Sequence, residues 1–136
     1  MSTPATDFGV MRVPRDGLAD LLGAEKERGA VVLRLISGDE ADKAAFFQAV
    51  REMLPLDPPL GTYEDVWDAL VDSLFGGIDG LEVPQVVVAW PDADEMRRAH
   101  PADAHEAEGV LASVAKTLAE PRFTANRPTA LRVYLT

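Results

Sequence analysis

Three short apolar runs, separated by segments with helical patterns, most strongly constrain the fold of this 136-residue chain. They cover residues 30–36, 83–90 and 130–135. Each run is almost continuously apolar, which is typical of a strand that is buried on both faces. Strands that alternate with helices pair in parallel through right-handed crossovers. The sequence therefore predicts an α/β fold, with a small three-stranded parallel sheet and helices packed against it.

Helical segments fill the gaps between these runs. Ser37 with Glu40, and Thr62 with Asp65, have the spacing of capping boxes, so we expect a helix to begin at each pair. The helix after Thr62 should end at the glycine pair of residues 76–77, because glycine commonly follows a helix C-terminus. The other predicted helices cover residues 16–28, 92–99 and 103–120.

Length and composition indicate one domain. Residues 1–29 should form an N-terminal extension of it, with one helix and a short strand at residues 9–13, while residues 30–136 form the main unit. The chain contains no cysteine, which excludes disulfides and thiolate metal sites and fits a reducing cytoplasm. The apolar runs are far shorter than a membrane span, and the N-terminal residues lack the pattern of a secretory signal. We expect a cytoplasmic protein.

Acidic residues are concentrated in the middle of the chain. The net charge is −10, and no lysine or arginine occurs between Arg51 and Arg97. A pI near 4.5 argues against binding to nucleic acid or to an anionic membrane, and it favours a basic protein partner. The stretch contains eleven carboxylates: Glu52, Asp57, Glu64, Asp65, Asp68, Asp72, Asp79, Glu82, Asp92, Asp94 and Glu95.

Three of these carboxylates, Glu64, Asp68 and Asp72, follow the i, i+4, i+8 spacing of neighbours on one helix face. Like charges at this spacing destabilise a helix by about 0.2–0.5 kcal/mol per pair. An unfavourable arrangement of like charges that brings no structural gain often marks a functional site. On the opposite face we expect Val66 and Trp67 to pack in the core with the other apolar residues of the helix.

The order of several motifs resembles the barstar family of small bacterial proteins, which inhibit secreted guanyl-preferring ribonucleases. These motifs are a Leu-Pro pair and a glycine before a helix with Trp67-Asp68-x-Leu70, and then a valine-rich strand that begins near Pro84 and ends at Trp90. The likeness covers about residues 30–136. It implies that the helix containing Asp68 and the loop before it block the active site of a ribonuclease.

The resemblance also implies roles for individual residues. Asp68 takes the place of an RNA phosphate, and the second carboxylate is Glu64 or Asp65, depending on how the loop is aligned. The chain departs from the family pattern at Lys116, where relatives are acidic, and in residues 75–81, which look like an insertion. Pro59 and Leu60 stand where relatives usually have aromatic residues. The remaining expected partner contacts are Pro59, Leu60, Gly61, Trp67, Asp72 and Glu120.

These observations predict an intracellular inhibitor, of the antitoxin or immunity type, for a basic guanyl-preferring endoribonuclease. We expect a monomer with no catalytic residue, no cofactor and no metal. One alternative is an acidic adaptor that uses the same fold to bind another basic protein. The other is a metal enzyme, but its candidate ligands have the spacing of no familiar metal site: His100, Asp103, His105 and Glu106.

Overall fold

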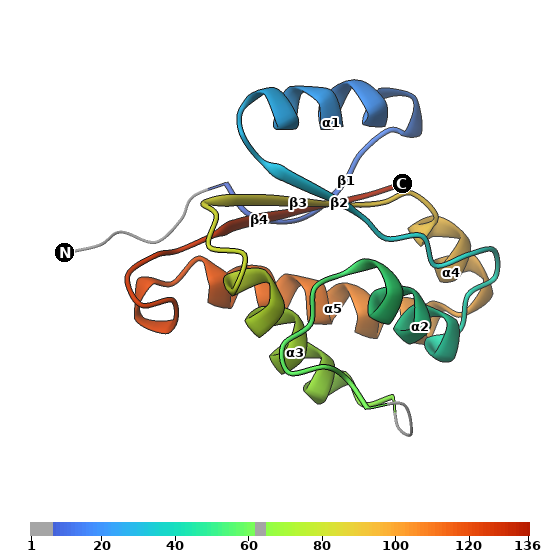
Figure 1. The fold of residues 1–136 in the computed structure, drawn as a ribbon. Coiled ribbons are helices and arrows are strands. Elements are labelled where there is room, and N and C mark those ends of the chain that lie inside the picture. The colour runs from blue at the N-terminus through green and yellow to red at the C-terminus, as the bar shows by residue number, and fades with distance from the viewer. Residues whose placement is uncertain (1–6, 62–64) are drawn as a thin grey trace.

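The computed structural model, which describes residues 7–61 and 65–136, shows a parallel sheet with helices on both faces (Figure 1). The sheet has four strands in the order β1-β4-β3-β2. Within the described residues, no helix is long and apolar enough to cross a bilayer. The strands are β1 (Gly9–Arg12), β2 (Val31–Arg34), β3 (Gln85–Trp90) and β4 (Ala130–Leu135). The helices are α1 (Leu18–Glu27), α2 (Lys43–Met53), α3 (Trp67–Asp79), α4 (Ala93–Ala99) and α5 (Pro101–Leu118).

The fourth strand corrects the prediction of a three-stranded sheet. β1 pairs in parallel with β4, so that Val10 lies opposite Val133. β4 is buried along its whole length, because it has a neighbour on either side. β2 lies at an edge, and its residues Val31, Val32 and Leu33 are only half-buried. The prediction of a strand buried on both faces was therefore right for β3 and β4 and wrong for β2.

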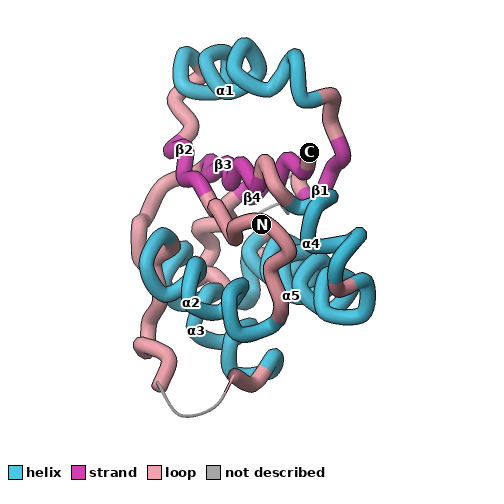
Figure 2. The backbone as a smooth tube through the Cα atoms, turned by 90° about the vertical axis from the view of Figure 1, so that its right-hand side faces the viewer, coloured by secondary structure: helices cyan, strands magenta, loops and turns pink. Residues whose placement is uncertain are grey.

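The two faces of the sheet carry cores of different size. Helices α2, α3, α4 and α5 cover one face, and α1 alone covers the other, as Figures 1 and 2 show. The larger core contains Phe46, Leu70, Trp90 and Leu111, all fully buried. Trp90 lies between the sheet and α2, with its ring centroid 5.2 Å from that of Phe46.

A buried polar network attaches α1 to the sheet. The Glu25 carboxylate is fully buried and accepts hydrogen bonds from Arg132 Nε at 2.7 Å and from the Tyr134 hydroxyl at 3.1 Å. Arg132 also donates to the Gln85 side chain at 2.8 Å. A buried ion pair is costly to break, because the partner that remains is an unpaired buried charge. The segment formed by β1 and α1 is thus built into the fold.

Two helices begin later than the capping boxes predict. α2 begins at Lys43, and its cap is Asp42, whose carboxylate accepts a hydrogen bond from the Ala45 N–H at 2.9 Å. The hydroxyl and N–H of Ser37 donate instead to Asp92, on the loop after β3. α3 begins at Trp67. The predicted start at Thr62 lies outside the described residues.

The end of α3 was also predicted wrongly. The helix continues through Gly76 and Gly77 as far as Asp79, and it includes part of the segment that looks like an insertion. A Cβ atom at Gly76 would overlap the carbonyl oxygen of Asp57, and one at Gly77 would overlap that of Pro55. These glycines therefore allow the preceding loop to lie directly against the helix, and they do not end it.

Candidate functional site

The loop that precedes α3 is fixed against that helix. The N–H of Asp57 donates to the Ser73 carbonyl at 2.9 Å, within the stretch where the loop backbone touches the two glycines. Leu56 and Leu60 are half-buried against the core, while Pro59 and Gly61 are exposed. A loop that is already ordered loses less entropy when a partner binds it. The part of the loop at residues 55–57 is thus held against α3, and the expected contacts Pro59, Leu60 and Gly61 follow it in sequence.

Arg51 of α2 holds both ends of the segment that leads into α3. Its guanidinium donates to the Gly61 carbonyl and to the Asp65 carboxylate, each at 2.8 Å. The guanidinium carbon also lies 5.7 Å from the centroid of the Phe47 ring. Asp65 is therefore neutralised within the chain. Glu64, the other candidate for the second carboxylate, lies outside the described residues.

Trp67 joins the core to the surface. Its ring centroid lies 4.9 Å from that of Phe47 and 5.9 Å from that of Phe46, yet its side chain is only half-buried. Lys43 Nζ lies 5.3 Å from the Trp67 ring centroid. Val66 is 42% exposed, so the expectation that both residues are in the core was wrong for Val66. The partly exposed Trp67 ring therefore lies beside Asp68, the next residue in the sequence.

Asp68 and Asp72 are exposed on successive turns of α3. Neither forms an ion pair with any residue that the structure describes. Because α3 begins at Trp67, Asp68 is in the first turn, where the positive end of the helix dipole stabilises a carboxylate. The start predicted from Thr62 and Asp65 would place Asp68 beyond the first turn, where the dipole has less effect. The fold therefore leaves Asp68 available to a cation from outside the chain.

Two hollows flank Trp67 and Asp68. One, of about 330 Å³, is also lined by Lys43, Asp65, Val66 and Glu106. The other, of about 280 Å³, is also lined by Val71, His105, Glu106, Gly109, Val110 and Ser113. Glu106 thus joins Asp68 at both hollows, although the sequence pattern marked it as a possible metal ligand and not as a partner contact. No local pattern predicts this, because it depends on α5 lying beside α3.

Glu120, the expected rim contact on the last long helix, lies elsewhere. It is half-buried and follows α5, which ends at Leu118, and it lines neither hollow. Glu106 precedes it by fourteen residues, or roughly 21 Å along a helix at 1.5 Å per residue. The structure therefore does not bring Glu120 and Asp68 together at these hollows.

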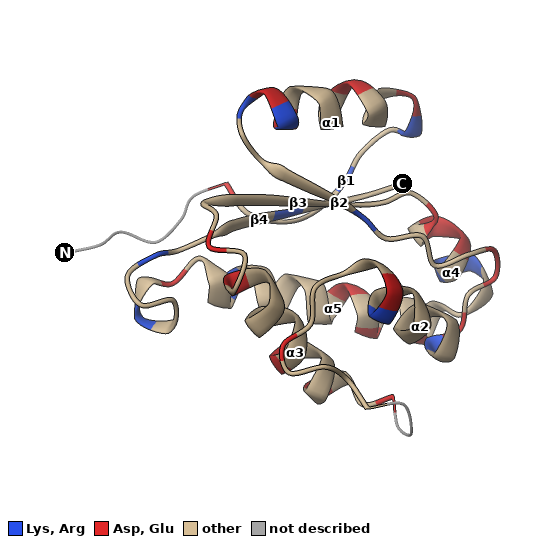
Figure 3. Cartoon of the chain, in the orientation of Figure 1, with Lys and Arg blue, Asp and Glu red and all other residues tan. Residues whose placement is uncertain are grey.

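Most other carboxylates of the acidic stretch have partners within the chain. Asp92 accepts hydrogen bonds from the N–H groups of Ser37 and Gly38. Charged groups of both signs occur at both ends of the sheet (Figure 3), so the acidic stretch of the sequence does not form a region of a single sign of charge in the folded chain. The ion pairs are Asp79 and Glu82 with Arg127, Asp94 with Arg12 and Arg97, and Glu95 with Arg15.

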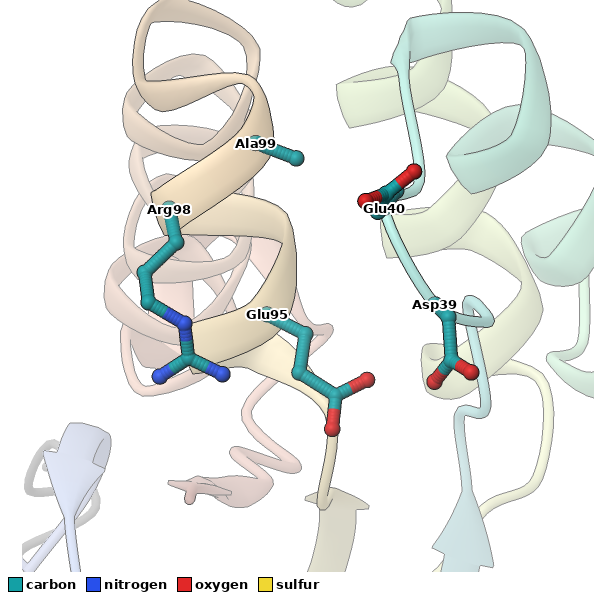
Figure 4. A pocket seen from close by; sticks show the side chains of 5 residues that line it. All are labelled: Asp39, Glu40, Glu95, Arg98 and Ala99. Atoms are coloured by element: carbon teal, nitrogen blue, oxygen red, sulfur yellow. The ribbon is translucent and has the colours of Figure 1, made fainter.

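A further hollow, of about 640 Å³, lies at the carboxyl end of the sheet, between α4 and the loop after β2. Figure 4 shows the Glu95 side chain extending from α4 toward the loop that carries Asp39. The neighbouring Asp39 carboxyl is the main cause that raises the pKa of Glu95, and burial and the charge of Asp92 add to it. Arg15 acts in the opposite direction. This hollow lies outside the segments that the family resemblance singles out.

Among residues 7–61 and 65–136, no group of three or more acidic, histidine or cysteine side chains could hold a metal ion. Asp103 accepts a hydrogen bond from the Lys43 N–H at 3.1 Å and so helps to orient the start of α2. His105 and Glu106 are exposed on α5. The residues of the metal alternative are thus divided between a structural contact and the surface beside Asp68.

Comparison with known protein families gives a match over residues 30–136, to the family described as Barstar (barnase inhibitor). The match extends from the start of β2 through β4 and includes α3, the loop before it and α5. It leaves β1 and α1 outside. Neither the curated proteins nor the solved structures gave a match.

Proposed function

Because the chain belongs to the barstar family, whose members are inhibitors of barnase-type ribonucleases, we propose that it binds a basic endoribonuclease and blocks its active site. The chain itself performs no catalysis in this proposal. It acts inside the cell that produces the nuclease, as an antitoxin or immunity protein would. A guanyl-preferring enzyme of the barnase type is the first candidate partner.

The observation that carries this proposal is the state of Asp68. Most carboxylates of the acidic stretch are paired with arginines or bonded to backbone N–H groups, whereas Asp68 is exposed and has no cationic partner among the described residues. It lies beside the half-buried Trp67, on a helix that a fixed loop supports. The fold thus presents Asp68 as an unpaired carboxylate at a well-defined position, with the likewise unpaired Asp72 one turn further along α3.

A carboxylate at this position can replace a phosphate of the substrate. A ribonuclease must bind a polyanion, so its active site is basic. Arginine side chains of such a site can donate paired hydrogen bonds to a carboxylate, and these charge-assisted contacts are among the stronger ones in proteins. Asp68 would thus be the central contact, with Trp67, Pro59, Leu60 and Gly61 forming the surface around it.

The other expected contacts take different roles. Asp65 is bonded to Arg51, so it would hold the loop in place and contribute little charge to the partner. Asp72 is exposed one turn after Asp68 and would lie at the rim of the contact, where a charge affects the association rate more than the lifetime of the complex. Glu64 and Glu120 remain predicted contacts.

Inhibition of barnase is the direct test. RNA cleavage by the enzyme would be measured against increasing amounts of the protein, and the expected result is stoichiometric loss of activity. Asp68→Asn should lose most of the inhibition, while Asp20→Asn, an equal change of charge on exposed Asp20 of α1, should not. Equal inhibition by the two variants would argue against an active-site contact at Asp68.

The host's own ribonucleases would extend the test beyond barnase. Failure to inhibit barnase and every basic ribonuclease of the producing organism would reject the inhibitor function. Capture of a basic protein that is not a nuclease, with equal loss of binding in the Asp68→Asn and Asp20→Asn variants, would instead indicate an adaptor.

A further inference from the structure

We propose that Glu106 of α5 forms a second contact with the partner, beside Asp68, and that Lys43 of α2 opposes the entry of the partner's arginine. This inference rests on the proposed function for the nature of the partner. It adds a residue from a different helix, and it assigns an opposing role to one of the chain's own cations.

The two hollows beside Trp67 support the role of Glu106. They share Trp67, Asp68 and Glu106 in their linings. Neither carboxylate of this group forms an ion pair with another described residue, whereas Asp65, at the edge of one hollow, is bonded to Arg51. Asp68 and Glu106 are thus the two carboxylates that this surface offers to a cation from another molecule.

Lys43 shows independently that a cation fits at this place. Its ammonium lies 5.3 Å from the centroid of the Trp67 ring and 5.9 Å from that of Phe47, and its side chain lines the same hollow as Asp68 and Glu106. It forms no ion pair with a described carboxylate. The attraction of a cation to an aromatic face holds it near the ring. A partner's cation that enters this hollow therefore meets the like charge of Lys43, which lines it together with Asp68.

The geometry favours an arginine of the partner over a lysine. A guanidinium is planar, can donate two parallel hydrogen bonds to one carboxylate and can stack on an aromatic ring. A site that combines the half-buried Trp67 ring with carboxylates on two helices offers all of these contacts. A lysine of the partner would bring only a point charge, and Lys43 already supplies a positive charge at this place. Lys43 thus acts as a specificity residue, because it penalises weakly oriented cations.

The test uses matched pairs of variants. Glu106→Gln is compared with Glu27→Gln, and Lys43→Gln with Lys26→Gln, because Glu27 and Lys26 are exposed on α1, on the opposite face of the sheet. Each pair changes the net charge equally. Glu106→Gln and Lys43→Gln change side chains only, so the backbone N–H of Lys43 can still donate to Asp103. Melting midpoints would verify that the variants fold.

Two probes keep this inference separate from the proposed function. The first is barnase, with association and dissociation rates measured. The second is an octa-arginine peptide at low salt, followed by tryptophan fluorescence, which reports on Trp67 because Trp90 is fully buried. With barnase, Glu106→Gln should weaken binding about tenfold or more, which corresponds to one lost charge-assisted contact. Lys43→Gln should speed association about threefold relative to Lys26→Gln.

The outcomes distinguish the two proposals. If the peptide binds in a manner that depends on Glu106 and Lys43, the inference stands, even if no nuclease is inhibited and the inhibitor function fails. If Glu106→Gln behaves like Glu27→Gln with both probes, or if the peptide does not bind the native protein, the inference is overturned. If barnase inhibition depends on Asp68 and not on Glu106 or Lys43, the inhibitor function stands and the inference about Glu106 and Lys43 is rejected.

Discussion

Two groups of carboxylates from the same acidic stretch have opposite environments in the folded protein. The helix-tip carboxylates, Asp68 and Asp72, are exposed and have no cationic partner among the described residues. The second group, Asp92, Asp94 and Glu95, lies beyond the carboxyl end of β3, and these residues are called here the sheet-edge carboxylates. Asp94 and Glu95 form ion pairs with arginines, and Asp92 accepts hydrogen bonds from backbone N–H groups. In sequence the two groups look alike, because neither has a lysine or arginine nearby except at Arg97 and Arg98. Spatial partners, and not local sequence, distinguish a binding group from a structural one.

The arginines that neutralise the sheet-edge group come from distant parts of the chain. Arg12 is the last residue of β1, Arg15 follows that strand, and both are about eighty residues away in sequence from Asp94 and Glu95, which they contact at 3.4 and 3.9 Å. These residues precede the segment that matches the family. The N-terminal extension therefore contributes a strand and a helix, and it also balances charge at one edge of the sheet.

The largest expected effect is on binding and concerns the helix-tip group. Asp68→Ala should weaken binding to the target ribonuclease by about 2–5 kcal/mol, a range for truncated interface ion pairs whose known examples include the barnase–barstar complex itself. Asp94→Ala, at the sheet edge, should change affinity by less than about 0.5 kcal/mol. Isothermal titration of both variants would measure this. Equal losses would show that only total charge matters.

The second prediction concerns the loop that supports the helix tip. Gly77→Ala should destabilise the protein by about 1–3 kcal/mol or more, because the new methyl group would overlap the backbone at Pro55 and Leu56. Gly23→Ala in α1 is the matched control, since no atom lies near its Cβ position. That replacement should stabilise the helix by about 0.5–1 kcal/mol.

Urea denaturation would measure both glycine variants. An equal gain in stability for Gly77→Ala and Gly23→Ala would mean that the loop does not lie against α3. Affinity provides a second readout, because displacement of the loop should also weaken binding of the ribonuclease, whereas Gly23→Ala should leave it unchanged.

The third prediction inverts the comparison between the two groups. Asp92→Ala removes the acceptor for the N–H and hydroxyl groups of Ser37 and the N–H of Gly38, so we expect a loss of about 1–3 kcal/mol in stability. Affinity for the ribonuclease should be unchanged. Asp72→Asn, on α3, should show the reverse, with unchanged stability and a modestly slower association at low salt. Thermal melting and stopped-flow kinetics would separate these effects.

The smallest effect depends on pH. The pKa of Glu95 is raised from its ordinary value of 4.5, mainly by the neighbouring Asp39 carboxyl. A carboxyl whose pKa is higher in the folded chain stabilises the fold only while protonated, so its contribution is present below 4.5 and is lost as pH rises through the folded value. Glu95→Gln should therefore raise the melting midpoint at pH 7 and have little effect at pH 4. Glu27→Gln controls for net charge, and a lower midpoint at pH 7 would contradict the assignment.

Much of the fold could be predicted from patterns along the chain. Strands β3 and β4 were predicted to within two residues, and α4 and α5 were close to their predicted bounds, because continuous apolar runs and helical periodicity report burial directly. Helix ends were less predictable. The cap of α2 at Asp42 and the continuation of α3 through its two glycines depend on contacts with other elements, which local spacing does not reveal.

The sequence by itself determined that the chain is an α/β protein with parallel strands, and it identified Asp68 beside Trp67 as the residue to test. Only the tertiary structure decided which carboxylates remain without internal cations, that β1 adds a fourth strand, and that Glu106 and Lys43 lie beside Asp68. The physical reason is the range of the forces involved. Hydrophobic periodicity acts along one element, whereas ion pairs and close backbone contacts form between segments that only the folded chain brings together.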